Sequence, residues 1–414
     1  MNTSTKMWLH ISVFVLAVLL GTFGEPVEAK RFKHHKKIDV MTRNLYIGPH
    51  ISSFLAAQED PELLPGLGRQ AYYEIVNPDF NYRAKAIALE IAKKRPDVVA
   101  LQQVYKVYKD KSDFLTDPLD NIDFITGEIT PNAINPAFDY LQLFIDELMA
   151  FGLNYYVASS QELTDAELPA LLDEGLCDIR FTDRDVILVR KGVHMSDPVA
   201  YMYDIRFPFI FPAPAEFSDY VDSLVIYFSR GFVAADVKLR GNKYHVVNTH
   251  LETRLEALGP LAQFFQIGQA AELIAAINDW PKPVILLGDF NSLPEDPIIP
   301  IDEDNTIIPP YKLLQMNGYR DVCASRLNRR HAQGLTICQT ADLSDTISEL
   351  YDRPDLIWVK NMPYSWAFRT MGPIFTPAAC DRPPPVSTLI PNKAVYWPSD
   401  HADVSAVSRI PIFN

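Results

Sequence analysis

The stretch of sequence that decides the fold runs Val284-Ile285-Leu286-Leu287-Gly288-Asp289-Phe290-Asn291-Ser292. Its first four residues are apolar without alternation, which is typical of a strand that is buried on both faces of its sheet. A glycine then introduces a turn, and an acid and an amide follow. Such a strand needs cover on both faces, so the stretch predicts a layered α/β protein with polar side chains at the ends of its strands.

Similar runs rich in β-branched and aromatic residues recur along the chain between turn residues. The expected strands cover residues 38–46, 98–104, 155–159, 185–190, 224–239, 244–249, 284–287, 356–359 and 404–409. Helical spacing predicts helices over residues 83–94, 138–151 and 261–279. The first helix carries one apolar stripe, with Ala84, Ile87 and Ile91 in it, that must be buried against a sheet. We therefore expect helices on the outer faces of two packed sheets.

The N-terminal segment has the layout of a cleavable signal peptide. A polar start with Lys6 precedes an apolar run from Met7 to Leu20, and Val27-Glu28-Ala29 follows. The run is shorter than the roughly 20 apolar residues that a membrane-spanning helix needs. We expect residues 1–29 to be removed by cleavage after Ala29, a secreted or periplasmic location, and no integral membrane segment in the mature chain.

The mature chain is expected to be acidic. The formal net charge is −14, and it becomes −13 when Lys6, Glu25 and Glu28 are lost. A nuclease would be expected to present a basic groove, so this balance argues mildly against one. The basic run over residues 30–37 is expected to be a solvated tail. No Gly/Ser linker or repeat divides residues 38–414, which we expect to form one monomeric domain.

The cysteines suit an exported protein with one or two disulfides. They are Cys177, Cys323, Cys338 and Cys380, and none of their spacings is Cys-x-x-Cys, so neither a zinc site nor a redox motif is indicated. Cys323 with Cys338 is the first pairing we expect, because a short loop separates them, although four cysteines allow three connectivities.

Polar residues that are able to bind a metal or a phosphate occur at the ends of the apolar strands. The six places are residues 41–46, 97–104, 247–252, 287–292, 353–357 and 398–402. Each alone has a purely structural explanation, such as a turn. Together they supply oxygen ligands for a hard divalent cation, groups to surround a phosphoryl transition state, and a base for water. Hydrolysis of a phosphate ester requires this set.

Three of these phrases, in this order, resemble the endonuclease/exonuclease/phosphatase superfamily. They are Arg43-Asn44-Leu45-Tyr46, Gly288-Asp289-Phe290-Asn291 and Ser399-Asp400-His401. The superfamily includes deoxyribonuclease, apurinic endonuclease, neutral sphingomyelinase and inositol phosphatase relatives. Residues 182–190 and 248–252 are similar to an exported bacterial branch whose substrate is unknown. The resemblance implies a four-layered α/β/β/α sandwich, two packed mixed β-sheets flanked by helices, with the active site at one end.

The resemblance also implies catalytic roles. Asp289, with Asn291 beside it, would orient and deprotonate the attacking water. His401 would contact a phosphoryl oxygen, with Asp355 fixing its tautomer and raising its basicity. His250 would donate a hydrogen bond to another phosphoryl oxygen.

The metal region implied by the resemblance consists of Asn44, residue 103 and Asp400, and it would hold Mg²⁺ or Mn²⁺. The superfamily places a glutamate ligand at position 103, where this chain has Gln103. Loss of a unit charge about 2 Å from the cation removes several kcal/mol of attraction even at an effective dielectric of ~20, so metal binding should weaken. Two hypotheses stay open: an active phosphoesterase that needs more metal or accepts Mn²⁺, and a catalytically silent relative that binds a phosphorylated ligand.

Two arginines near strand ends are further candidates. Arg184 and Arg230 would contact a substrate phosphate, or each would pair with an aspartate as a purely structural group. Glu252, two residues after His250, is expected at the surface.

The substrate class stays open among a phosphorylated small molecule, a phospholipid headgroup and a nucleic acid. Proline-rich stretches at residues 204–215, 294–310 and 372–398 are expected to be ordered loops. The first contains the apolar run Ile205–Pro212. If exposed, this run would be a lipid-contacting lip and would favour a sphingomyelinase-like phospholipase, but a packed run is expected because exposed patches of this kind are uncommon.

Overall fold

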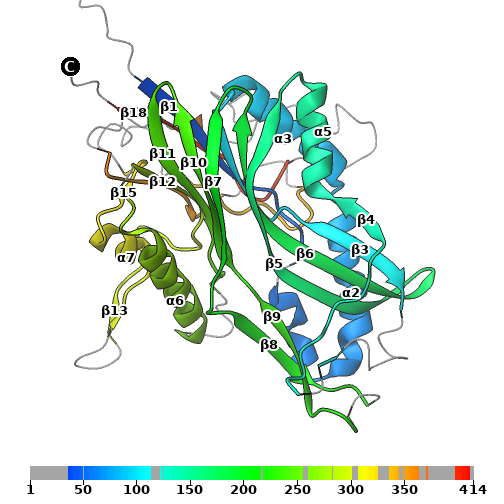
Figure 1. Cartoon of the computed structure of the whole chain (residues 1–414). Coiled ribbons are helices and arrows are strands. Elements are labelled where there is room, and N and C mark those ends of the chain that lie inside the picture. The colour runs from blue at the N-terminus through cyan, green and yellow to red at the C-terminus, as the bar shows by residue number, and fades with distance from the viewer. Residues whose placement is uncertain are drawn as a thin grey trace, which may run out of the picture.

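The first of two large sheets contains eight strands, shown in the computed structural model in Figure 1. The structure describes residues 36–49, 51–112, 122–123, 125–215, 218–254, 260–281, 283–300, 306–324, 335–344, 348, 350–362, 370–371 and 397–410. The strands are β1 (Lys36–Asn44), β2 (Val98–Gln102), β3 (Lys106–Lys111), β4 (Pro136–Asp139), β5 (Tyr155–Leu172), β6 (Gly175–Arg190), β17 (Thr370–Met371) and β18 (Val404–Ile410). Their order is β17-β18-β1-β2-β6-β3-β4, with β5 paired to β6. Because β1 is parallel to β2 and antiparallel to β18, the sheet is mixed.

The second large sheet contains six strands. They are β7 (His194–Met202), β10 (Gly231–Leu239), β11 (Asn242–His250), β12 (Val284–Asp289), β15 (Arg320–Asp321) and β16 (Asp355–Lys360). Their order is β15-β16-β12-β11-β10-β7, and only the β11–β12 pair is parallel. Two small sheets pair β8 (Phe207–Pro212) with β9 (Ser223–Phe228) and β13 (Ile299–Pro300) with β14 (Thr306–Ile307).

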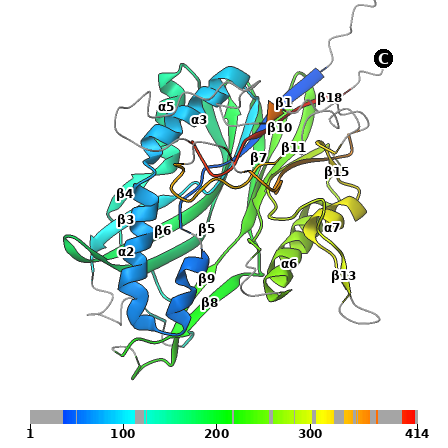
Figure 2. The same ribbon diagram turned by 180° about the vertical axis from the view of Figure 1, so that it is seen from behind.

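Three apolar layers establish the sandwich. Between the sheets, Val40 and Ile187 of the first pack with Val246 and Ile285 of the second. The outer face of the first sheet packs on α3 (Phe80–Lys94) and α5 (Tyr140–Ala150), and that of the second on α6 (Pro260–Ile277) and α7 (Pro310–Met316). The two views in Figures 1 and 2 show these helix pairs on opposite flanks. The expected four-layered α/β/β/α sandwich is confirmed.

Further elements border the end of the sandwich where β8 and β9 lie. They are η1 (Ile51–Gln58), η2 (Pro61–Leu63) and α2 (Leu64–Val76), which the sequence did not predict. The predicted single strand over residues 224–239 is wrong, since it divides at Ser229 and Arg230 into β9 and β10 of different sheets. The predicted strand 155–159 is too short, because β5 continues to Leu172 along β6.

The apolar run Ile205–Pro212 is packed, as expected. Its alternate residues Phe207, Phe209 and Phe211 are buried in one core cluster, whereas Ile210 is 48% exposed. The expected loop over residues 204–215 is therefore partly a strand, β8, because alternation of its side chains supplies one buried face. Residues 372–396 lie outside the described residues.

The structure describes only the last two residues of the predicted N-terminal tail, residues 30–37. Lys36 and Lys37 belong to β1, where they pair with Ile410 and Arg409, so the predicted tail ends before them. Residues 1–29 lie outside the described part, and cleavage after Ala29 stays a prediction. None of the helices within the described ranges has the length and apolar character that crossing a membrane requires.

The expected disulfide between Cys323 and Cys338 is wrong. None of the three described cysteines, which include Cys177, forms a disulfide. Cys323 packs against the inter-sheet core, whereas the thiol of Cys338 lies 3.4 Å from Asp400 Oδ2. Nearness in sequence did not bring the two thiols into the same surroundings. Cys380 lies outside the described residues.

Replacing Ile187 by alanine tests the inter-sheet core. Ile187 is fully buried there, so we expect Ile187→Ala to lower the free energy of unfolding by about 2–5 kcal/mol. Ile210→Ala, at a half-exposed position, is expected to cost only about 0.5 kcal/mol. Chemical denaturation of both variants measures the difference, and equal losses would contradict the assignment of this core.

Candidate active site

The candidate site forms where the inter-sheet core gives way to polar side chains along the same strand faces. On β1, Val40 lies in that core and Asn44 lies four residues further along. On β11, Val246 is followed in the same way by His250, and on β12 Leu287 is followed by Asp289. Side chains two or four residues apart on a strand share a face, so these polar groups face the space between the sheets.

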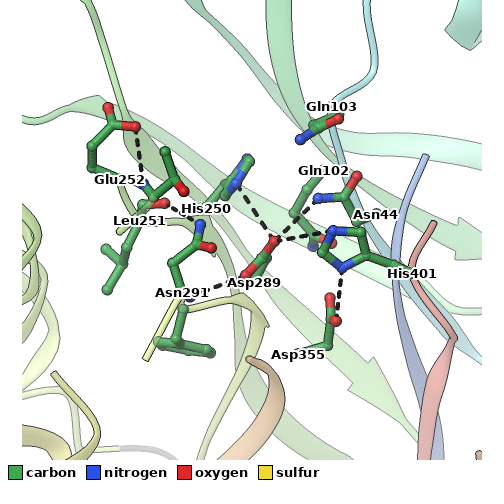
Figure 3. Close-up of polar contacts among 12 residues, drawn as sticks. Asn44, Gln102, Gln103, His250, Leu251, Glu252, Asp289, Asn291, Asp355 and His401 are labelled. Atoms are coloured by element: carbon green, nitrogen blue, oxygen red, sulfur yellow. Dashed lines mark hydrogen bonds and ion pairs between the residues drawn. The ribbon is translucent and has the colours of Figure 1, made fainter. Parts of the chain in front are cut away.

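Asp289 lies at the centre of the site, as Figure 3 shows. Its Oδ2 atom accepts a hydrogen bond from Asn44 Nδ2 at 3.2 Å. The same oxygen lies 3.6 Å from His250 Nε2 and 3.8 Å from His401 Nε2. Its Oδ1 atom accepts from the backbone N–H of Asn291 at 3.0 Å. Burial, and then the charge of Asp355, raise the pKa of Asp289 to about 6.

The turn at Asp289 needs its glycine. Gly288 has a φ of +150°, and a Cβ atom at this position would lie 1.9 Å from the backbone oxygen of Thr249. Only glycine permits this close approach of β12 to β11. Asn291 also adopts a positive φ, +47°, and its side chain donates to the carbonyl of Leu251 at 2.9 Å. The motif thus fixes Asp289, the last residue of β12, beside His250 at the end of β11.

His401 is held by carboxylates. Its Nδ1 lies 2.9 Å from Asp355 Oδ2, and its Nε2 lies 3.7 Å from Asp400 Oδ1. Burial opposes the charged ring, but Asp355, Asp400 and Asp289 outweigh it and raise the pKa of His401 to about 10. His401 is therefore an imidazolium at neutral pH. By contrast burial, followed by Arg230 and His401, holds the pKa of His250 well below its ordinary value, so that ring is neutral.

The charge on His401 is expected to depend on Asp355. Because its pKa is raised, protonation of His401 stabilises the fold fully below pH 6.5, and this contribution is lost as the pH rises through about 10. Asp355→Asn is expected to lower the pKa of His401 and to shift that loss to lower pH. An NMR titration of the metal-free protein measures it, with His245, paired with Asp236 elsewhere, as the internal control. An unchanged His401 midpoint would refute the assignment.

The expected metal region is only partly assembled. Gln103 follows β2 at a φ of +55°, and its Oε1 atom accepts from the backbone N–H of Ile47 at 2.9 Å. Figure 3 draws no contact between Gln103 and Asp289. Asn44 Oδ1 accepts from the backbone N–H of Tyr46 at 2.9 Å. The ligand roles of Asn44, Gln103 and Asp400 stay predictions.

Two carboxylates beside His401 are better placed to hold a cation. Ligand atoms of Asp289, Asp355 and His401 all lie within 4.8 Å of one another, and the three residues are buried. Asp355 Oδ1 has no hydrogen-bond partner within the described ranges, and it is buried. Two carboxylates, one of them with an unused oxygen, fit a cation that prefers oxygen ligands.

The two candidate arginines are paired with carboxylates. Arg184 contacts Asp139 and donates to the carbonyl of Val104 at 2.9 Å. Arg230 lies 3.2 Å from Glu252 and also contacts His250. Glu252 is buried, so its expected surface position is wrong. The reason is that it neutralises Arg230 beside the site.

Sequence reasoning missed two buried polar groups that support the site. Gln102 Nε2 donates to Asn248 Oδ1 at 2.5 Å and joins the two sheets. Arg83 donates to the carbonyls of Leu45 at 2.6 Å and Pro398 at 3.2 Å, so it ties together the segments that carry Asn44 and Asp400. A signal for Arg83 existed, since a charged residue lies on the buried face of a helix.

Among known proteins, only solved structures were found to be similar to this chain. No protein-family model and no curated protein matches the chain. An endonuclease/exonuclease/phosphatase family protein from Leptotrichia buccalis is 12% identical over 90% of this chain and 100% of its own, with a TM-score of 0.47. An endonuclease/exonuclease/phosphatase from Beutenbergia cavernae is 16% identical over 91% and 72%, with a TM-score of 0.47. TDP2 from D. rerio, complexed with single-strand DNA product, is 14% identical over 90% and 99%, with a TM-score of 0.43. Similarities this low carry no functional role over to this chain.

Proposed function

We propose that the chain is a metal-dependent phosphoesterase of the endonuclease/exonuclease/phosphatase class that acts by in-line attack of water. The observation that carries this proposal is the convergence of Asn44, His250 and His401 on the carboxylate of Asp289. The carboxylate of Asp289, which can accept a proton from water, then lies next to a charged donor, His401, and a neutral donor, His250. Hydrolysis of a phosphate ester needs these three groups.

In this mechanism Asp289 accepts the proton of the attacking water and Asn44 holds the carboxylate in place. The imidazolium of His401 binds a phosphoryl oxygen and stabilises the negative charge that grows on it. His250 donates from Nε2 to a second phosphoryl oxygen. Asp355 keeps the His401 ring oriented through Nδ1.

Asp289, Asp355 and Asp400, with Asn44 and Gln103 at the margin, are the residues that would hold Mg²⁺ or Mn²⁺. When bound, the cation supplies a Lewis acid that polarises the phosphoryl group. The missing carboxylate at position 103 leaves this region with less negative charge, so we expect activity to require millimolar metal.

Removal of the metal tests the proposal. The purified protein is expected to hydrolyse at least one member of a panel of phosphomonoesters, phosphodiesters, plasmid and single-stranded DNA and choline-phospholipid vesicles, with millimolar Mg²⁺ or Mn²⁺. EDTA is expected to abolish that hydrolysis, and excess metal to restore it, because the cation stabilises the transition state. Absence of hydrolysis of every member at millimolar metal would refute the proposal.

One observation favours the second hypothesis, a catalytically silent relative that binds a phosphorylated ligand. Gln103 Oε1 is engaged by the N–H of Ile47 rather than directed at Asp289. Binding of a phosphorylated ligand without turnover, measured by calorimetry, would support this reading. A lipid-contacting lip at residues 205–212 has no such support, since the phenylalanines of β8 are buried.

A further inference from the structure

The Nδ1 atom of His250 contacts a guanidinium rather than a carboxylate. Arg230 Nη1 lies 3.0 Å from His250 Nδ1, and both residues are buried. A guanidinium has only donors and stays protonated in proteins, so Nδ1 must be the acceptor. The proton of the neutral ring is then on Nε2, which lies 3.6 Å from Asp289 Oδ2.

Arg230 is itself fixed on two sides. Its Nη1 atom donates to Asp183 Oδ2 at 3.2 Å, and its Nη2 atom donates to Glu252 Oε1 at 3.2 Å. Asp183 is 0% exposed and Glu252 is 1% exposed, so neither carboxylate is available to solvent. Glu252 Oε1 also accepts from the backbone N–H of Thr253 at 2.9 Å. The planar fork of an arginine can serve two carboxylates and a ring nitrogen at once, which the single ammonium of a lysine cannot do with the same geometry.

We propose that Arg230 is a positioning residue that holds His250 in the Nε2–H tautomer, and that Asp183 and Glu252 hold Arg230 in this role. The proposal rests on the proposed function only where the Nε2–H group of His250 is directed at a phosphoryl oxygen. The two histidines beside Asp289 then differ in the partner of their Nδ1 atoms. His401 has an anion behind its ring and donates from Nδ1, whereas His250 has a cation behind its ring and accepts there.

The tautomer is measured directly in the full chain labelled with ¹⁵N-histidine, without metal or substrate. Long-range ¹⁵N–¹H correlations are expected to give His250 a bare Nδ1 and a protonated Nε2, with the signals assigned by their loss in His250→Gln. A proton on Nδ1 of His250 in the unmodified protein would overturn the proposal. This result does not depend on any hydrolytic activity.

Arg230→Lys tests the positioning role while keeping a cation between Asp183 and Glu252, so that the variant folds. We expect His250 to populate both tautomers and kcat to fall about tenfold or more, because an unoriented donor contributes less to the transition state. Arg180→Lys is the matched control, since Arg180 pairs with both oxygens of Asp165 and contacts no histidine among the described residues. We expect it to change neither readout.

Retention of the single tautomer in Arg230→Lys would overturn the positioning role even if kcat fell, because loss of packing alone would explain that fall. If the unmodified protein hydrolyses no ester, the proposed function fails. The tautomers of the two proteins still decide the role of Arg230.

Discussion

Replacing Asp289 by asparagine is expected to lower hydrolysis by about 10²–10⁴-fold, the range that a positioned general base contributes. Asparagine keeps the size of the side chain, and its amide oxygen can still accept from the N–H of Asn291, which Asp289 Oδ1 does at 3.0 Å. It removes the carboxylate that takes a proton from water in the proposed mechanism. We therefore expect kcat to fall much more than KM changes. Steady-state kinetics on the best ester of the panel, at saturating metal, measure it.

The matched control for this change is Asp236→Asn. Asp236 is a buried aspartate on β10, in the same sheet as Asp289. It lies five residues beyond Gly231, the residue opposite His250, and it pairs with His245. We expect the control to keep its rate, since Asp236 pairs with His245, which is not one of the residues of the site. A rate in Asp289→Asn equal to that of the control would remove Asp289 from the mechanism.

Replacing Gln103 by glutamate is expected to have the largest effect in the opposite direction. The two side chains have nearly the same shape, and a carboxylate oxygen can accept from the N–H of Ile47 as Gln103 Oε1 does at 2.9 Å. The second oxygen brings a unit negative charge to the metal region, worth several kcal/mol of attraction before desolvation offsets part of it. We expect the metal concentration for half-maximal activity to fall at least about tenfold, equivalent to about 1.4 kcal/mol.

Metal titrations of hydrolysis by Gln103→Glu and by Gln102→Glu separate this effect from a general gain of charge. Gln102 is adjacent in the chain, but its amide donates to Asn248 and Thr42 between the sheets, where a carboxylate would lack the donor. We expect Gln102→Glu to gain nothing and to lose stability. If Gln103→Glu stays inactive at millimolar metal while binding a phosphorylated ligand, the catalytically silent relative is the better account.

The sequence by itself determined the layered fold and most of the expected catalytic residues. Continuous apolar strands such as Val284–Leu287 are stable only between two covering layers, and the polar residue that ends each strand lies at the same rim as its neighbours. Asn44, His250 and Asp289, the last residues of β1, β11 and β12, were singled out for that reason, and His401 as a polar residue shortly before β18. The roles expected of them came from the resemblance of three short motifs to a known superfamily, and those roles stay predictions.

Only the tertiary structure decided which partners contact these side chains. Glu252 is buried because it pairs with Arg230, the buried residue just before β10, whose other carboxylate partner is Asp183. Cys323 and Cys338 lie in different surroundings although they are close in sequence. The charge of a histidine depends on whether a carboxylate or a guanidinium faces its Nδ1 atom, as at His401 and His250. Those partners come from distant segments of the chain, so no local pattern of residues could specify them.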